Sequence, residues 1–194
     1  MHRGLEPKQE YLDNLVCRIL QDCSFNQAEA LSEVKGYLEF EKTLRDKYSA
    51  DAFEKYDKMK IFEWMGHDKE GRLVVQFNIR NNRMSQITDH EKYLDYFSLI
   101  TEFWAQDRMK GWADEAVVLS DARDFTMDSF HLGVLKGVVD RCAKMHTFTR
   151  PCKIIAYNNG FLTKSIVNVL KSILPTQIVD MLVFLGSDEQ EITE

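Results

Sequence analysis

The stretch Val117–Asp121, VVLSD, decides the fold of this chain. It is an apolar run that ends in an aspartate; an amphipathic segment over Ser129–Met145 follows, and then a second apolar run, Lys153–Asn158. This order is typical of a βαβ unit, whose two strands are parallel and buried on both faces. The pattern therefore predicts an α/β protein. Because open parallel sheets bind ligands at the carboxyl ends of their strands, we expect a functional site near Asp121 and Asn158.

Helical spacing predicts two antiparallel helices at the start of the chain. The side chains expected to face inward are Leu12, Leu15, Val16, Ile19 and Leu20 on the first helix, and Ala30, Leu31, Val34, Tyr37 and Leu38 on the second, which Asn26 caps. A short helical turn over Phe53–Tyr56 follows. We expect this N-terminal helical segment to occupy residues 1–56.

The remaining residues, 57–194, are predicted to form one α/β domain with a mostly parallel sheet flanked by helices. The pattern indicates strands at Ile61–Trp64, Leu73–Ile79, Ala116–Asp121, Lys153–Asn158 and Met181–Leu185, the first two joined as a hairpin. It also indicates a long helix over Asp89–Met109 and a last helix over Thr163–Leu174, which Pro175 ends.

Composition narrows the function classes. With 31 acidic and 25 basic side chains among 194 residues, the formal charge is −6, which argues against a protein that binds nucleic acid by neutralising phosphates. No apolar run approaches the roughly 20 residues that span a bilayer, and the N-terminus lacks the apolar core of a secretory signal. The four scattered cysteines favour reduced thiols in the cytoplasm.

Searches for catalytic motifs favour a protein that is not an enzyme. The chain has no glycine-rich phosphate loop, no GxSxG nucleophile motif and no HExxH zinc motif, so we predict no cofactor and no metal. One alternative stays open: Asp121 and Asp124 stand at a strand's carboxyl end and could hold magnesium for phosphoryl chemistry. Aspartates in such turns more often satisfy backbone amides, and we favour that interpretation.

Several strings, in their order along the chain, resemble the CRAL-TRIO family of lipid-binding domains, which includes phosphatidylinositol/phosphatidylcholine and tocopherol transfer proteins. The strings are SFNQAEALSEVKGYLEFEKTLR (Ser24–Arg45), DKEGRLVV (Asp68–Val75), VVLSDARDFT (Val117–Thr126), KIIAYNNGFL (Lys153–Leu162) and MLVFLGSDEQE (Met181–Glu191). The resemblance covers nearly the whole chain. It implies a pocket whose floor is the sheet and whose lid is the helix after Asn158.

Together the resemblance and the pattern imply non-catalytic binding of a phospholipid or other small hydrophobic ligand, and its transfer between membranes by a cytoplasmic protein that associates transiently with them. The expected lining residues are Phe77, Ile79, Leu119, Tyr157, Phe161, Ile166, Leu170, Leu174 and Met181, and Lys164 and Lys171 are expected to contact anionic headgroups. From the residues alone, the alternation in a doubly covered strand leaves the face assignment open, and the lid's apolar stripe could instead seal a solid core.

The chain also departs from the family's pattern. Phosphatidylinositol-binding members carry a Glu and a Lys where this chain has Gly137 and Met181. The family also usually continues beyond the equivalent of Glu194, so we expect a C-terminally shortened form. These departures keep a second function class open, a protein-interaction scaffold of the same fold that binds, for example, a small GTPase.

Overall fold

The computed structural model describes residues 9–47, 50–108, 115–145, 150–158, 160, 165, 171 and 176–185. Its helices are α1 (Gln9–Asp22), α2 (Gln27–Asp46), α3 (Ala50–Lys58), α4 (His90–Arg108), α5 (Leu132–Met145) and α7 (Thr176–Asp180). Its strands are β1 (Phe62–His67), β2 (Leu73–Asn78), β3 (Glu115–Asp121), β4 (Arg150–Tyr157) and β5 (Leu182–Phe184). Three short 3-10 turns, η1 (Ile79–Asn81), η2 (Met84–Gln86) and η3 (Met127–Ser129), complete the described elements.

The sheet confirms the predicted α/β class. Its five strands lie in the order β1-β2-β3-β4-β5, with β1 antiparallel to β2 and the other neighbours parallel. The β1–β2 hairpin turns at Gly71, whose φ of +83° suits glycine. There, the Asp68 carboxylate accepts hydrogen bonds from the backbone N–H groups of Glu70 and Arg72, both at 2.9 Å.

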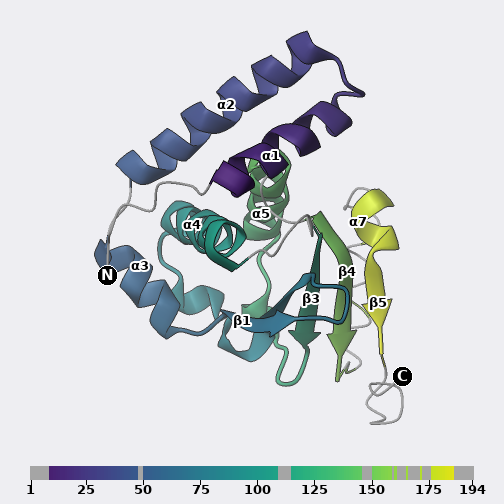
Figure 1. Cartoon of the computed structure of the whole chain (residues 1–194). Helices are drawn as coiled ribbons and strands as arrows, with labels where there is room; N and C mark the ends of the chain where they lie inside the picture. The colour runs from purple at the N-terminus through teal and green to yellow at the C-terminus, as the bar shows by residue number, and fades with distance from the viewer. Residues whose placement is uncertain are drawn as a thin grey trace.

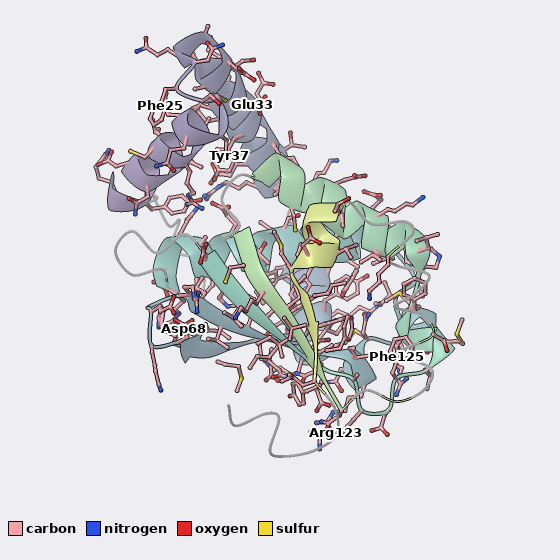
Figure 2. The ribbon with its side chains drawn as sticks, turned by 90° about the vertical axis from the view of Figure 1, so that its right-hand side faces the viewer. Phe25, Glu33, Tyr37, Asp68, Arg123 and Phe125 are labelled. Atoms are coloured by element: carbon pink, nitrogen blue, oxygen red, sulfur yellow. The ribbon has the colours of Figure 1, made fainter. Side chains whose placement is uncertain are left out.

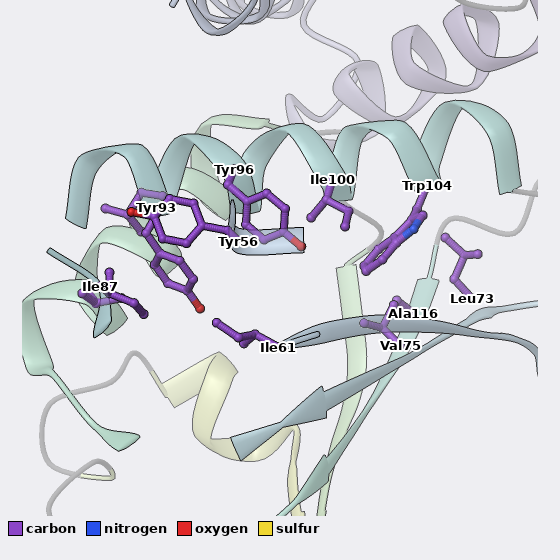
Figure 3. Packing of buried hydrophobic residues seen from close by; sticks show 12 residues of the cluster. Tyr56, Ile61, Leu73, Val75, Ile87, Tyr93, Tyr96, Ile100, Trp104 and Ala116 are labelled. Carbon is purple, nitrogen blue, oxygen red and sulfur yellow. The ribbon is translucent and has the colours of Figure 1, made fainter. Parts of the chain in front are cut away.

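The main core lies between one face of the sheet and the helices α3, α4 and α5 (Figure 3). From α4, Ile100 and Trp104 point toward Leu73, Val75 and Ala116 of the strands, whereas Tyr93 and Tyr96 lie beside Tyr56 of α3. Tyr56 of α3 packs edge-on against Tyr93, with ring centroids 5.5 Å apart. Helix α4 confirms the long helix that the sequence predicts over Asp89–Met109.

Helices α1 and α2 form the predicted hairpin, which lies beyond α4 and α5 on the side away from the sheet (Figure 1). Its own small core contains Leu15, Ile19, Cys23, Ala30 and Tyr37. The hairpin is attached to α4 through Glu102, a buried carboxylate whose Oε1 atom accepts hydrogen bonds from the hydroxyls of Tyr11 and Tyr37, both at 2.7 Å.

Helix α1 ends in a tight turn that contains no glycine. The N–H of Phe25 donates to the carbonyl of Leu20, and that of Ser24 donates to the carbonyl of Gln21, which is the pattern of a Schellman motif. Ser24 and Phe25 both have positive φ, +50° and +62°. Phe25 is 71% exposed and lies at the outer end of the hairpin (Figure 2).

Three details differ from the sequence-based expectations. Val16, Leu31 and Leu38, expected to face inward, are 42%, 56% and 49% exposed. The apolar stripe on each of these helices is wider than the surface that the partner helix covers, so apolar side chains at the margin of the stripe are exposed to solvent. Helix α3 is longer than the predicted turn, and α7 was not predicted.

The predicted helix Thr163–Leu174 falls almost entirely outside the described residues, although Ser165 and Lys171 within it are helical. Among the described helices, none is both long enough and apolar enough to cross a membrane.

Candidate functional site

The two faces of the sheet differ in what covers them. Leu73 and Val75 of β2, together with Ala116 of β3, pack against α4 and form the core described above. Because side chains alternate along a strand, Val74 and Gln76 lie on the opposite face. The pairing of β2 with β3 aligns these two residues with Val117 and Leu119, which therefore share that face.

The register extends this second face across β4 and β5. Leu119 pairs with Ile155, and Ile155 pairs with Val183. Val74, Leu119, Ile155 and Val183 are half-buried, whereas Val117 is fully buried. The second face is therefore an aliphatic surface that crosses four strands and is less closely covered than the α4 side.

One polar pair interrupts this aliphatic surface. The Gln76 side-chain amide donates a hydrogen bond to the Tyr157 hydroxyl at 3.0 Å. Gln76 is 8% exposed, so this contact satisfies a polar group that would otherwise be costly to bury. It also confirms that the side chains of β2 and β4 at this level lie on the same face.

Asp121 and Asn158 meet at the carboxyl edge of the sheet, as the sequence predicts. Asn158, with φ of +57°, donates its amide to Asp121 Oδ1 at 3.0 Å. The Arg123 guanidinium donates to Asp121 Oδ2 at 2.8 Å through Nε, and the Arg123 backbone N–H donates to Oδ1 at 3.1 Å. Burial opposes ionisation of Asp121, but the hydrogen bonds from Arg123 and Asn158 outweigh it and lower the pKa of this carboxyl below its usual value.

This arrangement favours the structural interpretation of Asp121. Both carboxylate oxygens are occupied by donors from the turn after β3 and from the end of β4. Asp124 is exposed and has a φ of +56°. Within the described part of the chain, no cluster of three or more His, Cys, Asp or Glu side chains could hold a metal ion.

Further bonds tie the same edge to the turns beside it. Arg83 donates to the Thr126 hydroxyl at 2.7 Å and to Ser129 Oγ at 3.1 Å. Asp128 accepts from both the backbone N–H and the hydroxyl of Ser85, each at 2.8 Å. The turns that follow β2 and β3 are thus fastened to each other next to Asp121.

A comparison with family models identifies the family of this chain: the model of the CRAL/TRIO domain matches residues 57–194. The chain belongs to the CRAL/TRIO domain family. This membership supports lipid binding at the level of the family.

The crystal structure of Sfh5 has the same fold as this CRAL/TRIO chain. The two are 10% identical, with a TM-score of 0.65, and the match covers 95% of this chain and 67% of the Sfh5 chain. At this identity the likeness concerns the fold alone. A comparison with curated protein sequences found no match.

The sheet brings together only some of the residues that we expected to line a CRAL/TRIO pocket. Leu119 and Tyr157 share the second face. Phe77 does not: it packs against the α4-side core and stacks on Phe62 of β1, with ring centroids 5.1 Å apart. Phe77 alternates with Gln76, and therefore points to the other side of the sheet from Tyr157.

The other expected residues lie at the margins or outside the described residues. Ile79 is buried in the turn directly after β2, and the carbonyl of Met181 accepts a hydrogen bond from the N–H of Ile154 just before β5. The Lys171 ammonium lies 6.0 Å from the centroid of the Phe184 ring. The positions outside the described residues are Phe161, Lys164, Ile166, Leu170 and Leu174.

Sequence reasoning did not select Val74, Val117, Ile155 and Val183, which the register places beside Leu119. The sequence of β2 contains one indication of which side chains lie on the second face of the sheet. Gln76 is the one polar residue in the run Leu73–Phe77, and a polar side chain suits the face that is not part of a solid core.

Proposed function

We propose that this CRAL/TRIO chain binds one hydrophobic ligand, a phospholipid or another small lipid, against the second face of the sheet, beneath the segment 161–174. The observation that carries the proposal is the half-buried aliphatic surface formed by Val74, Leu119, Ile155 and Val183. The opposite face already has a complete core, so this surface is not needed to hold α4.

Burial of apolar ligand surface supplies the binding free energy. Each methylene that leaves water contributes about 0.8 kcal/mol, so an acyl chain lying along the four strands gains several kcal/mol without any charged contact. The paired Gln76 and Tyr157 provide one polar point at the middle of this surface. Such a binder needs no acid, base or nucleophile, so we propose a non-catalytic role.

The headgroup contacts are proposed to differ from those of phosphatidylinositol binders. Gly137 has no carboxylate to offer, and a Cβ atom there would lie 2.4 Å from Leu94 Cδ1, so the Leu94 side chain would have to shift to admit an acidic side chain. Lys164 and Lys171 remain our candidates for contact with anionic headgroups. Transfer between membranes by a cytoplasmic protein that associates transiently with them is part of the same proposal.

A blocking substitution tests the proposal. Leu119→Trp fills the second face without adding charge, and Met127→Trp, at a 63% exposed position, is the matched control. We expect the full chain and the control to bind a fluorescent phospholipid, and Leu119→Trp to bind it at least about tenfold more weakly with an unchanged melting temperature.

A solid core on the second face would give a different result for both stability and lipid binding. If Leu119 is part of a solid core, Leu119→Trp overpacks it and lowers stability by about 1–3 kcal/mol, while the unaltered chain binds no lipid. That pair of results would overturn the proposal and favour the protein-interaction scaffold.

A further inference from the structure

The N-terminal hairpin has a second apolar face that no described element covers. On this face Val16 of α1 and Leu31 and Leu38 of α2 are exposed to 42%, 56% and 49%. Leu12, Leu20 and Val34 beside them are half-buried. We call these six residues the outer face of the hairpin.

Helix geometry places the outer face on one side. Val16 directly follows the buried Leu15, and Leu31 directly follows the buried Ala30, so each is rotated by 100° from a side chain in the hairpin core. Because α1 and α2 are antiparallel, equal rotations turn both side chains to the same side of the hairpin. Tyr11 and Tyr37 reach Glu102 of α4 from the other side. The outer face therefore points away from the rest of the molecule.

Opposite charges border this face on its two edges. Lys35, Glu39 and Lys42 are exposed along this edge of α2, which therefore carries a net positive charge. Each lysine lies four residues after Leu31 or Leu38. Asp13 is exposed on α1, on the edge beyond Val16, and accepts a hydrogen bond from Gln9 at 2.8 Å. Within the part of the chain that the structure describes, neither lysine forms an ion pair.

We propose that the outer face binds the outer face of a second copy of this chain, so that two hairpins form a four-helix bundle. A twofold axis parallel to the helices stacks α1 of one copy on α2 of the other in antiparallel orientation, which is a standard packing for such bundles. The two CRAL/TRIO domains then lie on opposite sides of the bundle and do not obstruct each other.

The charges fit this arrangement. Asp13 lies nine residues before the end of α1, and Gly36 lies nine residues after the start of α2, so the two are at the same level in the hairpin. Under the twofold axis, Asp13 of one copy comes to the edge of α2 in the other copy next to Lys35, with Glu39 one helical turn beyond this lysine and Lys42 after it. The same contact occurs twice, because the interface is self-complementary.

The size of the face sets the expected strength. Two helices, each presenting about 20 Å of length and about 10 Å of width, give a patch smaller than the roughly 800 Å² per partner of a standard interface. A weak dimer is therefore expected, with a Kd in the micromolar range or above.

Sedimentation equilibrium of the full chain from about 1 µM to about 1 mM tests the proposal, because this range brackets a Kd of that size. We expect a monomer–dimer equilibrium whose Kd rises at least about tenfold in Leu31→Ser/Leu38→Ser. Met127→Ser, which removes an exposed apolar side chain far from the hairpin, is expected to leave the Kd unchanged. Asp13→Lys should weaken the dimer, and adding Lys35→Glu and Lys42→Glu to it should restore the affinity.

Three outcomes would overturn the proposal. A chain that stays monomeric at the highest concentration has no such dimer, and a dimer insensitive to Leu31→Ser/Leu38→Ser uses another surface. If the chain is monomeric but binds vesicles of phosphatidylcholine and phosphatidylserine, and this binding is lost in the same variant, the outer face contacts a lipid surface instead. Because the Leu119→Trp test measures lipid binding at the sheet, its result is independent of this one.

Discussion

Asp121 shows how a single carboxylate organises the edge of the sheet. Its two oxygens join the turn after β3 to the end of β4 through Arg123 and Asn158. Neither turn has to be held by a ligand, since side chains of the chain itself supply the bonds. This edge of the sheet is therefore held together by the chain's own side chains.

Replacing Asp121 with Asn should destabilise the fold by about 1.5–3 kcal/mol at pH 7, because hydrogen bonds to a charged partner are lost. The pKa of Asp121 is lowered in the folded state. Its contribution to stability is therefore complete above the unfolded value of about 3.9 and is lost as the pH falls through the folded value.

Urea denaturation of the two proteins at pH 7 and at pH 3 measures this effect. The stability gap between the unaltered chain and Asp121→Asn should narrow at the lower pH. An equal gap at both pH values would show that the charge of Asp121 does not contribute.

Most substitutions lower the stability of a protein, but replacing Ser24 with glycine is expected to raise it. As a non-glycine residue at φ +50°, it adopts a conformation that costs roughly 1–2 kcal/mol in an L-residue. We expect Ser24→Gly to stabilise the chain by about 1 kcal/mol in thermal or urea unfolding.

The matched control is Ser32→Gly, the same change in the interior of α2, which should destabilise by about 0.5 kcal/mol. If both substitutions shift stability in the same direction, the turn conformation assigned to Ser24 is wrong.

At the scale of elements, Gly137 lets the Leu94 side chain of α4 lie directly against the backbone of α5. An alanine Cβ there would meet Leu94 Cδ1 at 2.4 Å, so the Leu94 side chain would have to shift to admit it. Gly36 in α2 has no atom within 4 Å of the same position. The two glycines lie in helices but in opposite environments.

We therefore expect Gly36→Ala to stabilise the chain by up to about 1 kcal/mol through helix propensity, and Gly137→Ala to lose this gain or to destabilise. Differential scanning calorimetry of both variants gives the comparison. Equal stabilisation by the two would contradict the close contact of the Leu94 side chain with Gly137.

The attachment of the hairpin to α4 is a second element-scale feature. Each tyrosine hydroxyl bonded to Glu102 should contribute about 1 kcal/mol, so Tyr11→Phe/Tyr37→Phe should lower the free energy that holds α1 and α2 in place. Hydrogen exchange should then accelerate in α1 and α2 more than in α4. Uniform acceleration across the chain would indicate that the hairpin and the domain unfold as one unit.

The sequence predicts the order of helices and strands better than it predicts the face of the sheet on which each side chain lies. Large side chains at helical spacing mark α4, and apolar runs mark β3 and β4, because these signals are local. The face of β2 is not local: Leu73 and Val74 are both apolar, and only pairing with β3 and contact with α4 distinguish them. For that reason the expected lining set included Phe77 beside Leu119 and Tyr157, although Phe77 points to the α4 side. Leu31 was placed inward because the apolar stripe of a helix does not show how wide the covering helix is.

For the whole molecule, the arrangement is three layers: the hairpin, the helices α4 and α5, and the sheet (Figure 1). The middle layer, α4 and α5, packs against the sheet on one side and against the hairpin on the other. Within the described residues, two further apolar surfaces lie outermost: the second face of the sheet and the outer face of the hairpin. We assign the first to a lipid and the second to another copy of the chain.

Native mass spectrometry of the full chain, purified without detergent and followed by organic extraction, tests the lipid assignment most directly. We predict one bound lipid per chain, present in the unaltered protein and absent or greatly reduced in Leu119→Trp. A chain that carries no stoichiometric lipid, and that acquires none after incubation with phospholipid vesicles, would contradict the account.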